Sequence, residues 1–214
     1  MSRLLAAAFD SGKFVTEANI RRYECILVEA RDEVTRVRVK RLLAEERAKL
    51  SAGQVASWYS PLAIFVEFVD EAIAVTGADM GNIQVADPAT RALHIVANRG
   101  FDLPFLTFFA VVRNDSDSAC GAALTHAERI IVPDVDQSPI FAGKRTGDVL
   151  RAAGVRAVQS TPVLSRAGSL IGMISTHWRS VTVPSDHQLR GLDPMIPRVA
   201  AAVDAATAPN VLSI

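Results

Sequence analysis

The chain of 214 residues has few cysteines and no net charge, and each of these features excludes a class of function. Its two cysteines, Cys25 and Cys120, lie far apart and do not form the disulfide framework of a small secreted domain. Lys and Arg number 23 and Asp and Glu number 23, so the basic surface expected of a nucleic-acid or anionic-membrane binder is missing. We therefore expect a cytoplasmic protein with no nucleic-acid partner.

Long hydrophobic runs and export signals are absent as well. No segment approaches the roughly 20 apolar residues that are needed to cross a bilayer. A short apolar patch follows Arg3, but Asp10 comes soon after it, and the patch is too short for the core of a signal peptide. We expect no direct association with a membrane.

Motifs for catalysis and metal binding are equally scarce. The four histidines His94, His126, His177 and His187 lack the close spacing of zinc ligands. The Gly-x-Ser-x-Gly motif of hydrolases is absent, and so are a kinase ATP-binding motif, a diguanylate cyclase motif and a basic DNA-binding helix pair. We expect no metal and no catalytic output domain, so any signal has to pass to a partner protein.

What the sequence does contain is enough apolar residues for a core, since hydrophobic residues make up 50%. Residues 16–50 are free of Gly and Pro, and their apolar side chains recur three and four residues apart, which predicts helix. Asp32 either begins a second helix or lies on the solvated face of one long helix. A helical hairpin and a single rod are both compatible with this segment.

The remaining chain predicts a mixture of helices and strands. A helix that carries Trp58 and Leu62 has Pro61 near its start and Gly77 at its end. Strands are expected over residues 78–86, 92–98, 129–132, 155–164 and 169–178, and further helices within residues 104–112, after residue 118, near residues 146–153, and over residues 185–206 with interruptions at Pro194 and Pro197. Asp87 to Thr90 is a turn sequence, and either Asp117 or Ser118 is expected to cap a short helix whose N-terminus favours an anion.

The last two strands form a predicted hairpin that carries polar side chains. Gln159 and Thr161 share one face of the first strand, and Ser175 and His177 share a face with Ile171 and Met173 in the second. A buried polar group without a partner costs about 1–3 kcal/mol. Each of these groups therefore needs a backbone group, a water molecule or a ligand.

This order of elements resembles the GAF domain, a relative of the PAS fold found in phytochromes, cyclic-nucleotide phosphodiesterases and bacterial signalling proteins. The resemblance covers about Val55 to Ala206, and its segments are TGADMGNIQVADPAT, IVANRGF, SACGAAL, RIIVPDV and AAGVRAVQSTPVLSRAGSLIGMISTH. It implies an α+β fold in which an antiparallel sheet of five to six strands has terminal helices on one face and a pocket of short helices and loops on the other. The expected organisation is a helical arm over residues 1–52, the GAF domain over 53–207 and a tail over 208–214.

The resemblance implies a non-catalytic, small-molecule-sensing module of bacterial signal transduction. Its ligand state would pass through the N- and C-terminal helices of a homodimer to a partner such as a sensor kinase. The expected ligand-binding residues are Asp117, Ser118, Cys120, Asp134, Phe141, Gln159, Ser175 and His177. Two alternatives stay open: a structural or dimerisation module whose pocket is filled by its own side chains, and an enzyme like the free methionine sulfoxide reductases, with Cys25 resolving an oxidised Cys120.

The resemblance to GAF domains does not identify a cofactor, but it argues against two of them. Phytochrome relatives attach bilin to a cysteine followed by histidine, whereas Gly121 follows Cys120, and the Asp-Ile-Pro chromophore motif is absent. His177 lies where phytochromes have Cys-His-His, here with Trp178 after it, and it is either a core histidine or a ligand contact. We expect neither covalent bilin nor haem.

Overall fold

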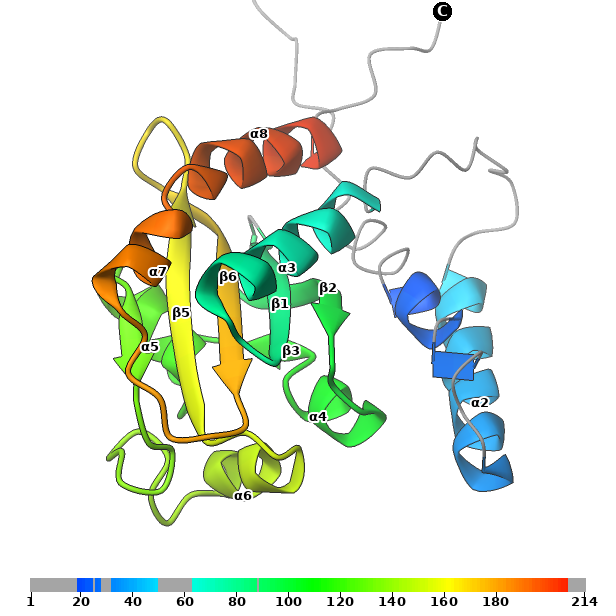
Figure 1. The fold of residues 1–214 in the computed structure, drawn as a ribbon. Coiled ribbons are helices and arrows are strands. Elements are labelled where there is room, and N and C mark those ends of the chain that lie inside the picture. Colours follow the sequence, from blue (N-terminus) through cyan, green and yellow to red (C-terminus); the bar gives the residue numbers. More distant parts are fainter. Residues whose placement is uncertain (1–18, 25, 28–31, 50–62, 88, 208–214) are drawn as a thin grey trace, which may run out of the picture.

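A six-stranded antiparallel sheet forms the centre of the domain (Figure 1). The computed structural model describes residues 19–24, 26–27, 32–49, 63–87 and 89–207. The strands are β1 (Met80–Ala86), β2 (Leu93–Arg99), β3 (Val111–Val112), β4 (Ile130–Val132), β5 (Ala157–Leu164) and β6 (Leu170–Trp178). Their order in the sheet is β3-β2-β1-β6-β5-β4, so β1 and β6 lie in the middle. The short strand β3 was not expected from the sequence.

The predicted turn between β1 and β2 is confirmed. The Asp87 carboxylate accepts hydrogen bonds from the backbone N–H of Ala89 at 2.7 Å and of Thr90 at 3.1 Å. This is the local pairing that makes Asp a turn residue. It brings the two strands together as antiparallel neighbours, with Gly81 opposite Arg99 at their far end.

The long hairpin of β5 and β6 is also confirmed, but its faces differ from the prediction. Gln159 pairs with Thr176 across the hairpin, and the register shifts near the turn, between Val163 and Leu164. Because of this irregularity, Ile171 packs with the helices on one side of the sheet, while Met173 faces the opposite side. The prediction that Ile171 and Met173 share a face was therefore wrong.

Three helices cover one face of the sheet (Figure 1). They are α3 (Ala63–Thr76), α7 (Asp186–Gly191) and α8 (Met195–Thr207). Gly77 ends α3 with φ +65°, a backbone conformation that glycine adopts without strain. The predicted closing helix is split into α7 and α8 around Pro194, while Pro197 is accommodated in the first turn of α8. Trp58, Pro61 and Leu62, in the predicted first part of α3, lie outside the described residues.

Shorter helices cover the other face, as predicted. They are α4 (Leu103–Phe108), α5 (Ala119–His126) and α6 (Arg145–Ala152). Of the two candidate caps for α5, Ser118 is the one used, because its hydroxyl accepts the backbone N–H of Gly121 at 2.9 Å. A second apolar core fills the space between these helices and the sheet. The sheet thus has one core on each face, as the predicted fold requires.

The N-terminal segment forms a helical hairpin, which decides between the two alternatives left open above. Asp32 accepts the backbone N–H of Thr35 at 2.7 Å and so caps α2 (Glu33–Lys49). Glu24 lies 2.7 Å from Arg47, 23 residues away, whereas one continuous helix would separate them by roughly 35 Å. Ile20 and Tyr23 pack against Val39, Leu43 and Leu103. No helix of the described segments is long and apolar enough to span a membrane. The boundary after residue 52 and the tail over 208–214 fall outside the described residues.

Candidate functional site

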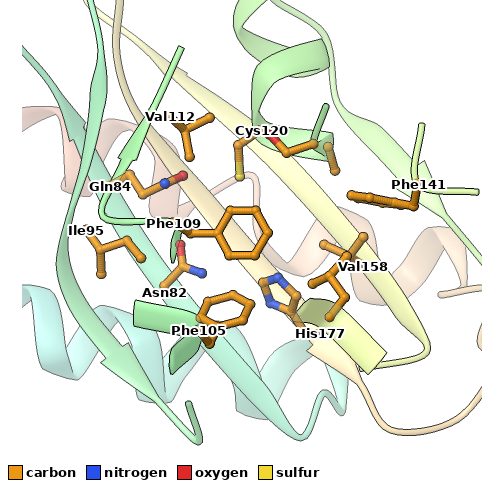
Figure 2. Close-up of a pocket in the computed structure, with 13 residues that line it drawn as sticks. Asn82, Gln84, Ile95, Phe105, Phe109, Val112, Cys120, Phe141, Val158 and His177 are labelled. Atoms are coloured by element: carbon orange, nitrogen blue, oxygen red, sulfur yellow. The ribbon is translucent and has the colours of Figure 1, made fainter. Parts of the chain in front are cut away.

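A small cavity lies between the sheet and the three short helices (Figure 2). It offers about 20 Å³ to the centre of a water-sized sphere. A water molecule requires about 10–15 Å³ on this measure, so the space suits one or two waters. The lining consists of Asn82, Gln84, Ile95, Phe105, Phe109, Val112, Ser118, Ala119, Cys120, Phe141, Leu150, Val158 and His177.

Two amide side chains form part of the cavity floor. Asn82 and Gln84 lie two residues apart on β1, so strand alternation directs both toward the same face. They are 3% and 1% exposed, and Figure 2 shows their amide groups among the apolar side chains of the cavity. Within the described part of the chain, Asn82 Oδ1 and Gln84 Oε1 have no hydrogen-bond partner. Each such oxygen lowers the stability of the fold by about 1–3 kcal/mol unless water or a ligand donates a hydrogen bond to it.

His177 lines the same cavity from β6. Its ring contacts the Phe101 ring edge to face, with centroids 4.9 Å apart, and lies 6.0 Å from the Phe105 ring. Burial lowers the pKa of His177 from 6.5 to about 3, so the imidazole is neutral at physiological pH. Its Nδ1 has no hydrogen-bond partner among the described residues. Three unpartnered polar atoms therefore line one small cavity.

Cys120 lies at the other side of the cavity, at the start of α5. Its Sγ is 3.3 Å from the hydroxyl of Ser160 and 3.3 Å from that of Ser175, and these two hydroxyls are 3.0 Å apart. Burial raises the pKa of the Cys120 thiol, although the two serine hydrogen bonds act in the opposite direction. The thiol is therefore protonated at neutral pH, and the thiolate that acts as a nucleophile is scarce.

Charged side chains are absent from the cavity lining given above. The N-terminus of α5 is nearby and stabilises an anion by about 0.3–2 kcal/mol. Removing an unpaired carboxylate from water costs several kcal/mol, which is the larger effect. The anion preference predicted for this helix end therefore does not suffice to hold a charged group in this cavity.

The wall formed by α6 and the segment before it has apolar side chains toward the cavity and charged side chains on its outer side. Phe141 and Leu150 point into the cavity from this wall. Outside it, Lys144 Nζ lies 2.6 Å from the carboxylate of Asp117. Arg145 lies over the Phe108 ring of α4, 5.6 Å from its centroid. A partly exposed ion pair contributes only about 0–1 kcal/mol, so this wall is held mainly by its apolar contacts.

The eight predicted site residues divide into three groups. Ser118, Cys120, Phe141 and His177 line the cavity, and Ser175 lies directly beneath Cys120, within hydrogen-bond distance of its sulfur. The cavity lining excludes Asp117, which pairs with Lys144, and Asp134, which lies 3.5 Å from Arg156 and accepts the backbone N–H of Asp136.

Gln159 is on the opposite face of the sheet, and its placement in the pocket was wrong. Its amide nitrogen donates to Thr176 Oγ1 at 3.1 Å, and its oxygen accepts from Thr161 Oγ1 at 2.8 Å. The register pairs Gln159 with Thr176, whereas Ser175 and His177 point the other way. Gln159 therefore forms its hydrogen bonds on the face of the sheet that is covered by α3, α7 and α8.

Sequence reasoning missed Asn82 and Gln84, although the signal was present. The strand sequence MGNIQVA places two amides at alternate positions in an otherwise apolar segment. Alternate polar residues in a strand ordinarily face solvent. Here both faces of β1 are buried, so the same pattern places two amides in the core.

Neither a metal site nor a resolving cysteine is formed by the residues that the structure describes. These residues contain no group of three or more His, Cys, Asp or Glu side chains that could hold a metal ion. Cys25, the expected resolving partner of Cys120 in a reductase, lies outside the described residues.

Comparison with models of protein families assigns this sequence and fold to a known family. The family model for the GAF domain matches residues 60–204, most of the chain and all of the sheet. The chain belongs to the GAF domain family. No curated protein sequence matches it. The fold and the family expected from the sequence are therefore both confirmed.

Several solved GAF-fold structures are similar to the chain. A domain of a protein described as a two-component sensor histidine kinase from Sinorhizobium meliloti is 16% identical with a TM-score of 0.57, covering 68% of this chain and 92% of that one. The GAF domain of an Acinetobacter phosphoenolpyruvate-protein phosphotransferase is 11% identical with a TM-score of 0.57, covering 89% and 94%. Type II free methionine-R-sulfoxide reductase from Thermoplasma acidophilum is 15% identical with a TM-score of 0.54, covering 69% and 95%. At these identities the likeness establishes the shared fold. GAF domains are commonly sensory or signalling modules, and some GAF proteins are enzymes.

Proposed function

We propose that this protein is a non-catalytic GAF sensor that binds a small molecule in the cavity between the sheet and α4, α5 and α6. The observation that carries the proposal is the convergence of Asn82 Oδ1, Gln84 Oε1 and His177 Nδ1, which have no partners among the described residues. Buried polar atoms of this kind are rare in folded proteins because each lowers stability. A ligand that forms hydrogen bonds with these three atoms removes this penalty, and the removal contributes to its affinity.

Strands β5 and β6 offer a route from the cavity to the C-terminal helix. Ser160, Ser175 and His177 face the cavity side, while the alternate residues Thr161 and Thr176 face the helices. From Thr161 the contacts continue outward, because Arg129 donates to Thr161 Oγ1 at 2.7 Å and to the Asp193 carboxylate at 2.7 Å.

Asp193 lies just before α8, so a change in the pairing of β5 with β6 would reach the start of this helix. A ligand shifts such an equilibrium only by its difference in affinity for the two states. We propose that α8 and the N-terminal helical hairpin report this difference, across a homodimer, to a cytoplasmic partner such as a sensor kinase.

The test has two steps. Native mass spectrometry of the purified protein, followed by denaturation, is expected to release a small molecule, and the variant Gln84→Met is expected to release less of it. Hydrogen exchange of α8 amides is then measured with and without that molecule. Slower exchange on binding in the wild type, and no change in Gln84→Met, is the expected result. Binding that leaves α8 and dimer affinity unchanged would refute the sensing role.

A second candidate is a structural or dimerisation module, and the cavity size favours it. The ring centroids of Phe105 and Phe109 are 4.8 Å apart, and both rings line the cavity together with Phe141, leaving room for only one or two waters. This candidate predicts no released molecule and a Gln84→Met variant that dimerises like the wild type. The mass-spectrometric step therefore separates the two candidates.

The lack of catalysis is part of the proposal. Cys120 is held as a protonated thiol between two serines, and the lining has neither an acid nor a base with a charged side chain. Incubation with free methionine sulfoxide and a thiol reductant is expected to give no turnover. Turnover that is lost in Cys120→Ala would establish the reductase alternative.

A further inference from the structure

The polar groups of the cavity define a chemical class of ligand, and this inference rests on the cavity being the ligand site. Asn82 and Gln84 each carry a carbonyl acceptor and an NH2 donor group, and the neutral imidazole of His177 carries one donor and one acceptor. The unpartnered amide atoms, Asn82 Oδ1 and Gln84 Oε1, are acceptors, so a matching ligand has to present N–H or O–H donors, and the NH2 groups beside them favour a ligand that also carries an acceptor. A pure hydrocarbon or a simple ketone leaves part of this set unsatisfied.

Charge is the second constraint. The lining contains no Asp, Glu, Lys or Arg among the described residues, and His177 is buried in its neutral form. A charged group that enters the cavity loses its hydration and meets no opposite charge. Lys144 and Asp117, on the outer side of the α6 wall, already pair with each other.

Size is the third constraint. With about 20 Å³ available to the centre of a water-sized sphere, the cavity takes a group of very few heavy atoms before Phe141 or Leu150 has to move. We infer that the ligand inserts a small, uncharged amide-type group, as in a primary amide, a lactam or a urea, between Asn82, Gln84 and His177. The zwitterion of a free amino acid and a phosphate ester do not belong to this class.

The test compares probes that match in shape and differ in charge. Formamide and formate each have three heavy atoms and differ in that one carries NH2 where the other carries a carboxylate oxygen, and acetamide and acetate form the next larger pair. Each is titrated into the full chain, and binding is followed by NMR through the backbone amides of Asn82 and Gln84 and their side-chain NH2 groups. Fragments of this size bind weakly, with Kd values in roughly the millimolar range. We expect the Kd of each amide to be at least tenfold lower than that of its carboxylate.

Two matched variants make the result specific to the cavity. Gln84→Met removes one donor and one acceptor from the lining and is expected to raise the Kd of formamide at least tenfold. Gln159→Met makes the same change on the opposite face and is expected to leave the Kd within twofold of the wild type, measured where both variants are folded. Carboxylates that bind as tightly as the amides, no saturable amide binding, or equal effects of the two variants would each overturn the inference.

Failure of this inference is distinguishable from failure of the sensing role. A charged molecule that co-purifies, occupies the cavity and slows exchange in α8 would overturn the ligand class and support sensing. Amide probes that bind selectively, without any co-purified molecule or natural ligand changing α8, would support the ligand class and refute sensing.

Discussion

Replacing Gln84 by methionine should stabilise the empty protein. The substitution removes Oε1, a buried atom without a partner among the described residues, whose cost is about 1–3 kcal/mol. Methionine has nearly the shape of glutamine and adapts to irregular gaps, so the misfit should cost less than about 1.5 kcal/mol. We expect the free energy of unfolding to rise by about 0.5–2 kcal/mol.

The same substitution on the opposite face supplies the control. Gln159 is as deeply buried as Gln84, but its amide donates to Thr176 and accepts from Thr161. Each of these bonds contributes about 0.5–1.5 kcal/mol, and Thr161 loses its acceptor when Gln159 is replaced. Gln159→Met should therefore lower the free energy of unfolding by about 1–3 kcal/mol. The two variants make the same chemical change, and we expect opposite signs for their effects on the free energy of unfolding.

The assay is urea unfolding followed by circular dichroism and tryptophan fluorescence, with calorimetry as a second measurement. For a domain of this size, 1 kcal/mol corresponds to about 2–4 °C in Tm. The linear dependence on urea should have the same slope in both variants, since the surface exposed on unfolding is unchanged. If Gln84→Met destabilises the protein as much as Gln159→Met does, Gln84 is satisfied in the native protein, and the argument for an unmet hydrogen-bonding set is refuted.

Three further predictions follow from single residues. His177 has a folded pKa of about 3 against 6.5 when unfolded, so only the unfolded chain binds a proton at pH values between these two. Between pH 6.5 and 4.5 the wild type should therefore lose about 2–3 kcal/mol of unfolding free energy relative to His177→Phe, measured by urea unfolding, and an equal pH dependence of the two proteins would contradict this. Cys120 should react with iodoacetamide at pH 7.5 at least tenfold more slowly in the folded protein than in urea, with the reaction at Cys120 followed by peptide mass spectrometry. Equal rates in the two states would contradict the burial of Cys120 as a protonated thiol. Gly121→Ala should lower the free energy of unfolding by about 1–3 kcal/mol, because the alanine Cβ would lie 2.3 Å from the Ser116 carbonyl oxygen. Alanine stabilises an open helix, so a gain in stability would show that α5 is less tightly packed at this position.

Much of the fold was predictable because it depends on local chemistry. The turn at Asp87, the cap at Ser118 and the helix end at Gly77 each follow from one residue and its immediate backbone. The hairpin of β5 and β6 follows from two β-rich runs with a short connection. The two-residue strand β3 gives no comparable signal, since its pairing with Leu93 and His94 is a tertiary contact.

The site was less predictable because it depends on which face each strand turns inward. Strand alternation groups Gln159 with Thr161 and Ser175 with His177, but it does not relate the two groups to each other. That relation is set by the register of the hairpin, and an irregularity near its turn shifts the register by one residue. Such a shift moves Gln159 to the opposite face. Asn82 and Gln84 were missed for a related reason, since only the complete fold shows that both faces of β1 are buried.

The two faces of the sheet use the same kinds of polar residue in opposite ways. On the helix side, Gln159, Thr161 and Thr176 satisfy one another, and Arg129 extends the network to Asp193. On the cavity side, the amides of Asn82 and Gln84 have nothing comparable among the described residues. Folding alone would favour apolar side chains at these two positions, because leucine and methionine fill similar volumes without the penalty of an unmet hydrogen bond. Water held in the cavity or a bound ligand would satisfy amides at both positions. Only a ligand explains a molecule that is released on denaturation and is reduced in Gln84→Met, so the mass-spectrometric step decides whether the cavity is a site or ordinary core.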